Sequence, residues 1–378
     1  GMFPFATPHT RCRRTKTVTR KPKTKSRRLI HMDIPRFIKD TIESSRLRFG
    51  IPGAGIAYVQ NGKVSWAEGF GVKNTNTDMQ VSGHTVFCAA SVSKVITAFL
   101  ALQIWSQKGL KLDEGIGRHI NLPDEDMSSI TPRQILSHTS GLPNWFPHLV
   151  ERLKGERALL PENCNLLSHP GERFIYSGEG YYWLQKVIEN ITDRSFELFA
   201  AQEVFSPLRM KHTSFVWKSA YRQTAAHAHD DANEPVDRSR AVELHAIPNA
   251  SASLYTTPYD LGLFLSHLML PDIRKIVDKM LSVQIDLSDR ISWSLGWGVE
   301  RPWKTQHPWY WHHGRGGFTN LVLWSAFHQK GLVVLTNTQR NVDAEHFTHE
   351  LTDAILGDEH AAFAFLPVST MKRLGFLV

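Results

Sequence analysis

The sequence predicts a mixed α/β protein of the α+β type, in which one antiparallel sheet is flanked by helices and a mainly helical lobe is inserted. Two strand-like segments, 53–60 and 63–72, surround Asn61-Gly62, which is a strong signal for a β-hairpin. Residues 131–240 have a mainly helical and loop-rich pattern, and strand patterns return from residue 293. The simplest arrangement pairs the late strands with the early hairpin and leaves the helical middle as an inserted lobe.

The remaining elements follow from local patterns in chain order. Residues 33–48 predict an amphipathic helix, with Ile34, Phe37, Ile38 and Ile42 on its apolar side. Residues 91–108 predict a buried helix, because apolar side chains occupy most of its sides, and Gly109 ends it. Thr131-Pro132 is a typical helix start. Further helices are expected at 180–190, 195–204, 258–270 and 343–356, a polar loop at 225–240, and strands at 294–299, 309–313, 318–325 and 331–336.

The composition is that of a globular protein without a membrane span. A chain of 378 residues can bury a large core, and it contains no run of about 18 apolar residues that could cross a bilayer. The three cysteines, Cys12, Cys88 and Cys164, are far apart and odd in number. This argues against a disulfide framework and against a cysteine-rich metal site, and we predict no cofactor.

The formal net charge of +8 originates in the N-terminal segment. Residues 11–28 contain ten Lys or Arg and residues 1–32 contain no acid, so removing ten charges from +8 leaves about −2 for the rest. We therefore expect residues 1–32 to be a disordered basic tail, tag or extension, and the body, 33–378, to bind no nucleic acid. Within the body we expect a sheet lobe (33–90 and 245–378) and a helical lobe (91–244). The tail lacks the apolar segment of a secretory signal peptide, which favours a cytoplasmic location.

Ser91-Val92-Ser93-Lys94, at the start of the apolar helix, is the first candidate for chemistry. Lys94 lies one helical turn after Ser91 on the same face, and burial there favours the neutral amine that can act as a base. The N–H of Ser91 at the helix start can form half of an oxyanion hole. The pattern alone is weak, because Ser369–Lys372 matches it too. A capping serine followed by a surface lysine is the alternative.

Two glycine-containing segments further along the chain are candidates for the same site. Tyr176 lies in a polar stretch that offers it little core, so a phenolate there can relay protons between Ser91 and Lys94. The segment His312-His313-Gly314-Arg315 lies beside a predicted strand, where glycine permits the close approach of a ligand or another backbone. Backbone N–H groups there can supply a second oxyanion donor. Simple packing of Tyr176 and an edge strand with a bulge are the alternatives.

Taken in this order, these segments resemble the penicillin-recognising serine hydrolases, which have a β-lactamase/transpeptidase-like fold. This family includes class C β-lactamases, D-alanyl-D-alanine carboxypeptidases, and esterases and D-amino-acid peptidases. The resemblance covers about residues 49–356. Besides the Ser91–Lys94 motif it includes Ile51-Pro52-Gly53, Ile130–Pro143, Pro170-Gly171-Glu172, Tyr176-Ser177, Pro207–Met210, Leu295–Gly298, the His312–Gly314 region and Val334–Asn337.

The resemblance implies a hydrolase that works through an acyl-enzyme. Ser91 would attack a carbonyl, Lys94 and Tyr176 would share the role of base, and the N–H groups of Ser91 and Arg315 would hold the oxyanion. The segment around His138 would be structural. The expected substrate is a small molecule or a short peptide, no metal or cofactor is implied, and the oligomeric state stays open.

Two departures from the family pattern bear on the substrate. Gly178 stands where the family commonly has an Asn that contacts the substrate amide, so a donor and an acceptor are missing. His312-His313-Gly314 replaces the usual Lys or His, Thr or Ser, and Gly, and His312 can bind a carboxylate only when protonated, with an ordinary pKa of about 6.5. We expect an esterase, or a hydrolase of small amides or D-peptides, rather than a true class C β-lactamase. The alternative is a non-catalytic penicillin-binding-like protein with a decayed site.

Other interpretations are weaker. No Gly-x-Ser-x-Gly motif occurs, which disfavours a Ser-His-Asp hydrolase with a nucleophile elbow. His227–Asp231 resembles part of a metallo-β-lactamase motif, but Ala232 stands where the last His is required, so a polar loop is favoured. Several tryptophans near the presumed cleft indicate either an aromatic pocket or core packing. These are Trp145, Trp297, Trp303, Trp309 and Trp311.

Overall fold

The computed structural model describes residues 34–122, 124–146, 148, 151–152, 154–155, 165–236, 246–301 and 307–357. The basic N-terminal segment, the Ser369–Lys372 motif, Cys12, Cys164 and Trp303 lie outside these residues. What the sequence suggests about them stays a prediction, and so does the division of the body into two lobes.

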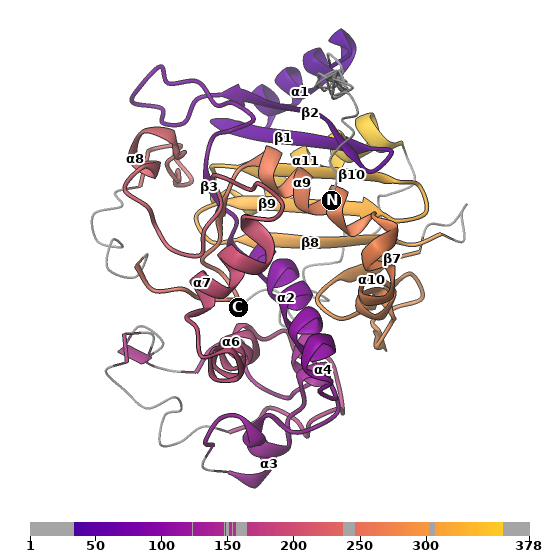
Figure 1. Ribbon diagram of the computed structural model, residues 1–378. Helices are drawn as coiled ribbons and strands as arrows, with labels where there is room; N and C mark the ends of the chain where they lie inside the picture. The colour runs from indigo at the N-terminus through magenta and orange to yellow at the C-terminus, as the bar shows by residue number, and fades with distance from the viewer. Residues whose placement is uncertain are drawn as a thin grey trace, which may run out of the picture. The chain divides into compact units, whose positions relative to one another are not determined.

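An antiparallel sheet of eight strands joins the two ends of the body (Figure 1). Its strand order is β2-β1-β10-β9-β8-β7-β6-β5. The early hairpin thus pairs with the late strands through β1 and β10, which confirms the predicted arrangement. The strands are β1 (Gly53–Gln60), β2 (Lys63–Gly71), β5 (Ile285–Asp286), β6 (Ile291–Trp293), β7 (Gly298–Glu300), β8 (Trp309–Arg315), β9 (Thr319–Ser325) and β10 (Lys330–Thr336). A two-stranded sheet pairs β3 (Phe87–Cys88) with β4 (Tyr255–Thr256).

The hairpin turn follows directly from its two residues. Asn61 and Gly62 have φ values of 52° and 65°. A two-residue turn with both φ values positive matches the right-handed twist of the strands on either side, and Asn and Gly tolerate this conformation best.

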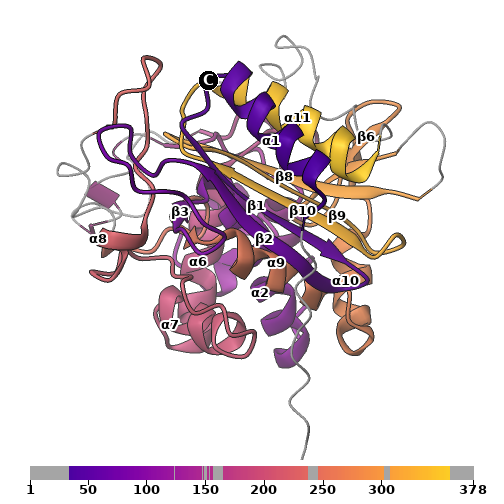
Figure 2. The same ribbon diagram turned by 90° about the horizontal axis from the view of Figure 1, so that it is seen from above.

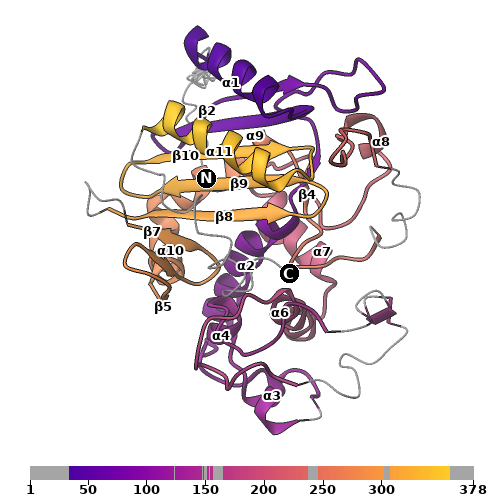
Figure 3. The same ribbon diagram turned by 180° about the vertical axis from the view of Figure 1, so that it is seen from behind.

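Helices cover both faces of the sheet. Leu332 and Val334 of β10 pack in one apolar cluster with α1 (Arg36–Arg48) and α11 (Asn341–Leu356), while Val333 and Leu335 pack in another with α2 (Ser93–Lys108) and α9 (Pro258–Leu268). Successive strand residues point to opposite faces, so an unbroken apolar strand such as β10 indicates cover on both sides. Figure 2 shows α1 and α11 together on one face, and Figure 3 shows α11 lying across the sheet.

Further helices lie outside the faces of the sheet described above, and the starts of α3, α4, α6 and α7 are capped by side chains. Thr131 and Gln134 form a capping box at α4, and the Ser177 hydroxyl accepts the Gly180 N–H at α6. These helices are α3 (Glu125–Ser129), α4 (Pro132–Leu136), α6 (Gly178–Thr192), α7 (Phe196–Ala200), α8 (Tyr221–Thr224) and α10 (Arg274–Leu281). Among the helices that the structure describes, none combines the length and the apolar character that a membrane crossing requires.

Two local predictions were wrong. Phe37 is 66% exposed, because the buried face of α1 follows the spacing of Ile38 and Ile42, and Phe37 lies to one side of it. Residues 294–299 are not one strand, because the chain turns between β6 and β7. Gly296 makes this turn with a φ of 93°, and a Cβ there would lie 2.4 Å from the Cβ of Ala98 on α2.

Candidate active site

Ser91 lies in a short 3₁₀ turn, Ala90–Val92, between β3 and α2, so the α-helix begins at Ser93 and not at Ser91. Ala90 has a φ of 48°, a left-handed conformation that costs a non-glycine residue about 1 kcal/mol. The turn is held by Ser93, whose hydroxyl donates to the Ala90 carbonyl (2.6 Å) and accepts the Leu254 N–H (3.0 Å). The half-buried Ser91 is therefore presented on a strained but firmly bonded turn.

Lys94 is fully buried directly behind Ser91. Its Nζ donates to the Ser91 hydroxyl at 3.1 Å and to the backbone carbonyl of Ser251 at 2.9 Å. Burial lowers the pKa of Lys94 from 10.5 to about 7, because the interior disfavours the charged amine. Near neutral pH a large fraction of Lys94 is thus an uncharged amine that can accept a proton from Ser91.

Tyr176 lies beside both residues. The Lys94 amine is 4.9 Å from the centre of its ring. Burial raises the pKa of Tyr176 well above its usual 10, and the hydrogen bond with Ser91 and the charge of Arg315 only partly offset this. Tyr176 is therefore a neutral phenol near pH 7. The structure does not favour the phenolate that the sequence suggested as a proton relay.

His138 packs against the ring of Tyr176 and binds the backbone of the next residue. Its ring centre is 4.3 Å from that of Tyr176, and its Nδ1 accepts the Ser177 N–H at 3.1 Å. Burial, together with the charge of Lys94, holds the pKa of His138 well below its usual range, so the ring stays neutral. This placement agrees with a structural role for the segment around His138, and it links that segment directly to Tyr176.

The open edge of β8 reaches the turn that carries Ser91. Strand β7 begins at Gly298, which pairs with Trp311, so β8 continues beyond β7 from His312. Gly314 lies so close to Ala89 that a Cβ would come within 2.2 Å of the Ala89 carbonyl oxygen. Glycine is therefore required at this approach. Whether the Arg315 N–H points to the oxyanion stays a prediction.

The charged groups around this edge are already neutralised. The His312 Nδ1 donates to the His313 carbonyl at 2.7 Å, and burial and the charge of Lys94 lower the pKa of His312 to about 3. Burial and the charge of Arg315 lower the pKa of His313 to about 3 as well. Arg315 itself forms an ion pair with Glu345 of α11. The protonated His312 that carboxylate binding would require is thus strongly disfavoured.

Comparison with known proteins places the chain in a family. The family model described as Beta-lactamase matches residues 38–355. The chain belongs to the beta-lactamase family. The mixed fold with an antiparallel sheet is that of this family of serine hydrolases.

Relatives in the beta-lactamase family are distant. Protein flp of Staphylococcus aureus (strain MW2) is 28% identical over 328 residues, which cover 79% of this chain and 62% of flp. Teichoic acid D-alanine hydrolase of Staphylococcus aureus is 22% identical over 223 residues, 56% of this chain and 53% of the relative. The chain thus spans less than two thirds of either relative. The octameric penicillin-binding protein homologue from Pyrococcus abyssi has the same fold, with a TM-score of 0.72 at 20% identity over 85% of this chain and 77% of that one.

Several residues of this beta-lactamase-family site carried no recognisable sequence signal. The Ser251 carbonyl binds Lys94 from a segment 157 residues further along the chain. The ring of Tyr181 lies 5.5 Å from the Lys94 amine. The Asn320 side chain donates to the Cys88 carbonyl at 3.1 Å and ties β9 to the strand before Ser91. Only Tyr181, in the stretch after Tyr176, lay close enough to a motif to be noticed.

The predicted polar loop around His229 and three of the candidate tryptophans do not join the site. His229 uses both ring nitrogens, since Nδ1 donates to the Asn337 carbonyl (2.9 Å) and Nε2 accepts the Thr75 N–H (3.2 Å). In the part of the chain that the structure describes, no three His, Cys, Asp or Glu side chains are grouped as metal ligands. Trp297, Trp309 and Trp311 are core residues, so they form no aromatic pocket.

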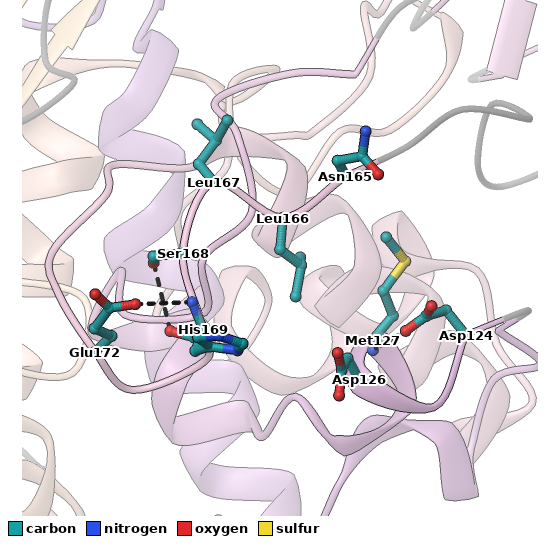
Figure 4. A pocket seen from close by; sticks show the side chains of 9 residues that line it. All are labelled: Asp124, Asp126, Met127, Asn165, Leu166, Leu167, Ser168, His169 and Glu172. Carbon is teal, nitrogen blue, oxygen red and sulfur yellow. Dashed lines mark hydrogen bonds between the residues drawn. The ribbon is translucent and has the colours of Figure 1, made fainter.

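A pocket of about 330 Å³ lies beside α3 (Figure 4). Asp124, Asp126 and Glu172 give it an acidic lining. Asp124 caps α3 by accepting the Met127 N–H, and Glu172 accepts the His169 N–H at 3.0 Å. Two of the three carboxylates therefore already accept hydrogen bonds from nearby backbone N–H groups. The pocket shares no residue with the Ser91 site.

Glu179 anchors the segment beneath the site, and its loss is expected to destabilise the protein. Its buried carboxylate pairs with the buried Arg152 and accepts the Trp183 indole N–H at 2.8 Å. Glu179→Gln removes the Glu179 carboxylate from the buried Arg152, so we expect the free energy of unfolding in urea to fall by about 3 kcal/mol. The matched control is Asp278→Asn, which breaks an exposed pair with Arg274 and should cost about 0.5 kcal/mol or less. Equal effects of the two variants would contradict this.

Proposed function

We propose that this protein is a serine hydrolase that forms an acyl-enzyme on Ser91 with esters whose acyl group carries no negative charge. One observation carries the proposal: the Lys94 amine, with a pKa of about 7, is hydrogen-bonded to the Ser91 hydroxyl at 3.1 Å. A base of this pKa within hydrogen-bond distance is what a serine nucleophile requires near neutral pH.

The mechanism assigns one role to each group. The Ser91 oxygen attacks the ester carbonyl while its proton passes to the neutral Lys94 amine. Tyr176, a phenol, gives its proton to the leaving alcohol as the C–O bond breaks, and takes up the proton held by Lys94, so that the Lys94 amine is neutral again before deacylation. The N–H groups of Ser91 and Arg315 stabilise the oxyanion. Water then attacks the acyl-enzyme, its proton returns through Lys94 to Ser91, and the acid leaves.

The charges at the site support a preference for neutral acyl groups. His312 is neutral and Arg315 is paired with Glu345, so neither is available as a cation for a substrate carboxylate. Gly178 supplies no carboxamide for a substrate amide. Both features disfavour β-lactams and peptides that end in a carboxylate. The name of one relative, teichoic acid D-alanine hydrolase, is consistent with a hydrolase of D-alanine derivatives, so small amides and D-peptides are the second candidates.

A substrate panel tests this preference. p-Nitrophenyl butyrate and p-nitrophenyl hemisuccinate have acyl chains of similar length, but only the second carries a carboxylate. We expect kcat/KM to be about 10-fold or more higher for the butyrate, because His312 is neutral and Arg315 already pairs with Glu345. Nitrocefin and D-Ala-D-Ala peptides should be poorer still. A preference for the hemisuccinate, or efficient hydrolysis of nitrocefin, would overturn the neutral-ester assignment.

A non-catalytic penicillin-binding-like protein is the second candidate function. Gly178 and the altered His312–Gly314 segment favour it, whereas the contact between Ser91 and Lys94 opposes it. Covalent labelling of Ser91, described in the Discussion, separates the two. The cytoplasmic location expected from the sequence stays a prediction.

A further inference from the structure

Trp145 occupies the space in which residue 178 would have a side chain. A Cβ built on Gly178 would lie 2.3 Å from the Cζ2 atom of the Trp145 indole and 2.6 Å from Cε2. Such distances are far inside van der Waals contact, so the indole ring and any side chain at residue 178 exclude each other. The absence of a side chain at Gly178 therefore leaves no empty space, because the Trp145 indole fills it.

The direction of residue 178 places this ring on the same side of the chain as Tyr176. Ser177 is extended, with φ −136° and ψ 119°. In an extended chain, residues i and i+2 project to the same side, about 7 Å apart. Tyr176 lies beside Ser91 and Lys94. The space that the Trp145 indole occupies therefore lies next to Tyr176, on the side of the chain that Tyr176 faces.

Hydrogen bonds on both sides of Trp145 hold its loop in place. Asn144 accepts the Gly178 N–H through its side chain (2.9 Å) and the Glu179 N–H through its carbonyl (2.8 Å). The Phe146 N–H donates to the Glu179 carboxylate at 3.2 Å. The residues before and after Trp145 are thus fixed to the start of α6. A ring mounted in this way is preorganised and loses little entropy when a substrate packs on it.

From these contacts we infer that Trp145 is the specificity-determining residue of the acyl site, and that it selects esters with an apolar acyl group. The inference rests on the proposed function. Trp145 is half-buried, so its side chain is not sealed within the core. An indole face offers a large apolar area and few hydrogen bonds, which favours flat or extended hydrocarbon groups over amide-bearing ones. Benzoyl and butyryl esters match this surface better than acetyl esters.

The test compares p-nitrophenyl acetate, butyrate and benzoate in the parent, Trp145→Ala and Trp145→Phe. In Trp145→Ala we expect the ratio of kcat/KM for benzoate over acetate to fall about 10-fold, because a missing apolar wall costs selectivity of this size. Trp145→Phe keeps an aromatic face and should keep most of the ratio. An equal fall for all three esters, or an unchanged ratio, would overturn the inference.

Two further measurements separate possible failures. Labelling by a small fluorophosphonate reports on Ser91 alone: a parent that is not labelled contradicts the proposed function, whereas labelling with an unchanged ester ratio contradicts only the role of Trp145. Gly178→Asn should unfold at lower urea concentration than the parent, since its Cβ meets the indole. In the Trp145→Ala background the same substitution should be tolerated. Additive effects of the two substitutions would show that Trp145 does not occupy this space.

Discussion

Replacing Ser91 with alanine is expected to lower kcat/KM for p-nitrophenyl butyrate by about 10⁴-fold or more, and to abolish covalent labelling by a fluorophosphonate. Removal of a serine nucleophile leaves only the oxyanion donors and substrate binding, which retain a small part of the rate. The Lys94 amine cannot replace the hydroxyl without forming an amide that water would not release. Intact-mass measurement of the labelled protein gives the direct readout, with one phosphonyl group on the parent and none on the variant.

The chain offers a matched control for this experiment. Ser369 belongs to the second Ser-x-x-Lys match, so Ser369→Ala removes the same residue type from the same sequence pattern. That variant should keep both ester hydrolysis and labelling. Persistent labelling of Ser91→Ala would contradict the assignment of the nucleophile, and an unlabelled parent would favour the non-catalytic alternative.

The sequence predicted the sheet well because its strands obey local rules. Asn61-Gly62 determines the hairpin turn, and the unbroken apolar pattern of β10 matches a strand covered on both faces. Phe37 and the 294–299 segment were mispredicted because tertiary contacts decide them. Helix α1 packs against α11, which is distant in the sequence. Gly296 turns so close to Ala98 that a Cβ would clash, and no local pattern records this approach.

Ser91, Lys94 and Tyr176 could be selected from the sequence because they lie in recognisable motifs, and the structure brings them into contact. The Ser251 carbonyl could not, because its role arises from the approach of a distant backbone segment. Trp145 was one of several tryptophans considered for an aromatic pocket, but its contact with residue 178 has no sequence signal. Burial was partly foreseeable: the apolar helix predicted a lowered pKa for Lys94. The much lower pKa of His312 depends on its full burial and on the nearby Lys94, which no local pattern records.

Replacing Lys94 with methionine is expected to lower ester hydrolysis strongly and to stabilise the fold. Loss of a general base typically costs 10²- to 10⁴-fold, so we expect kcat to fall about 10³-fold. In the parent, kcat/KM should rise as the pH passes through about 7, where Lys94 becomes the neutral amine. In Lys94→Met this rise should disappear and leave a flat residual rate. A variant that keeps the parent's pH profile would exclude Lys94 as the base.

The stability gain should depend on pH in a defined direction. The pKa of Lys94 is about 7 in the folded protein and about 10.4 in an unfolded chain, so the unfolded state binds the proton more tightly. The resulting destabilisation is complete below pH 7, shrinks as the pH rises above 7, and vanishes above about 10.4. Lys94→Met removes this destabilisation, but it also loses the hydrogen bond to the Ser251 carbonyl. The free energy of unfolding in urea should therefore rise by about 2 kcal/mol at pH 6, and this gain should disappear near pH 10.

Lys108→Met, at the exposed end of the same helix, is the control and should change the unfolding free energy by about 0.5 kcal/mol or less at either pH. A gain that did not depend on pH would mean that the charge of Lys94 carries no energetic cost in the folded protein. It would then contradict the lowered pKa of Lys94 and its role as a base near neutral pH.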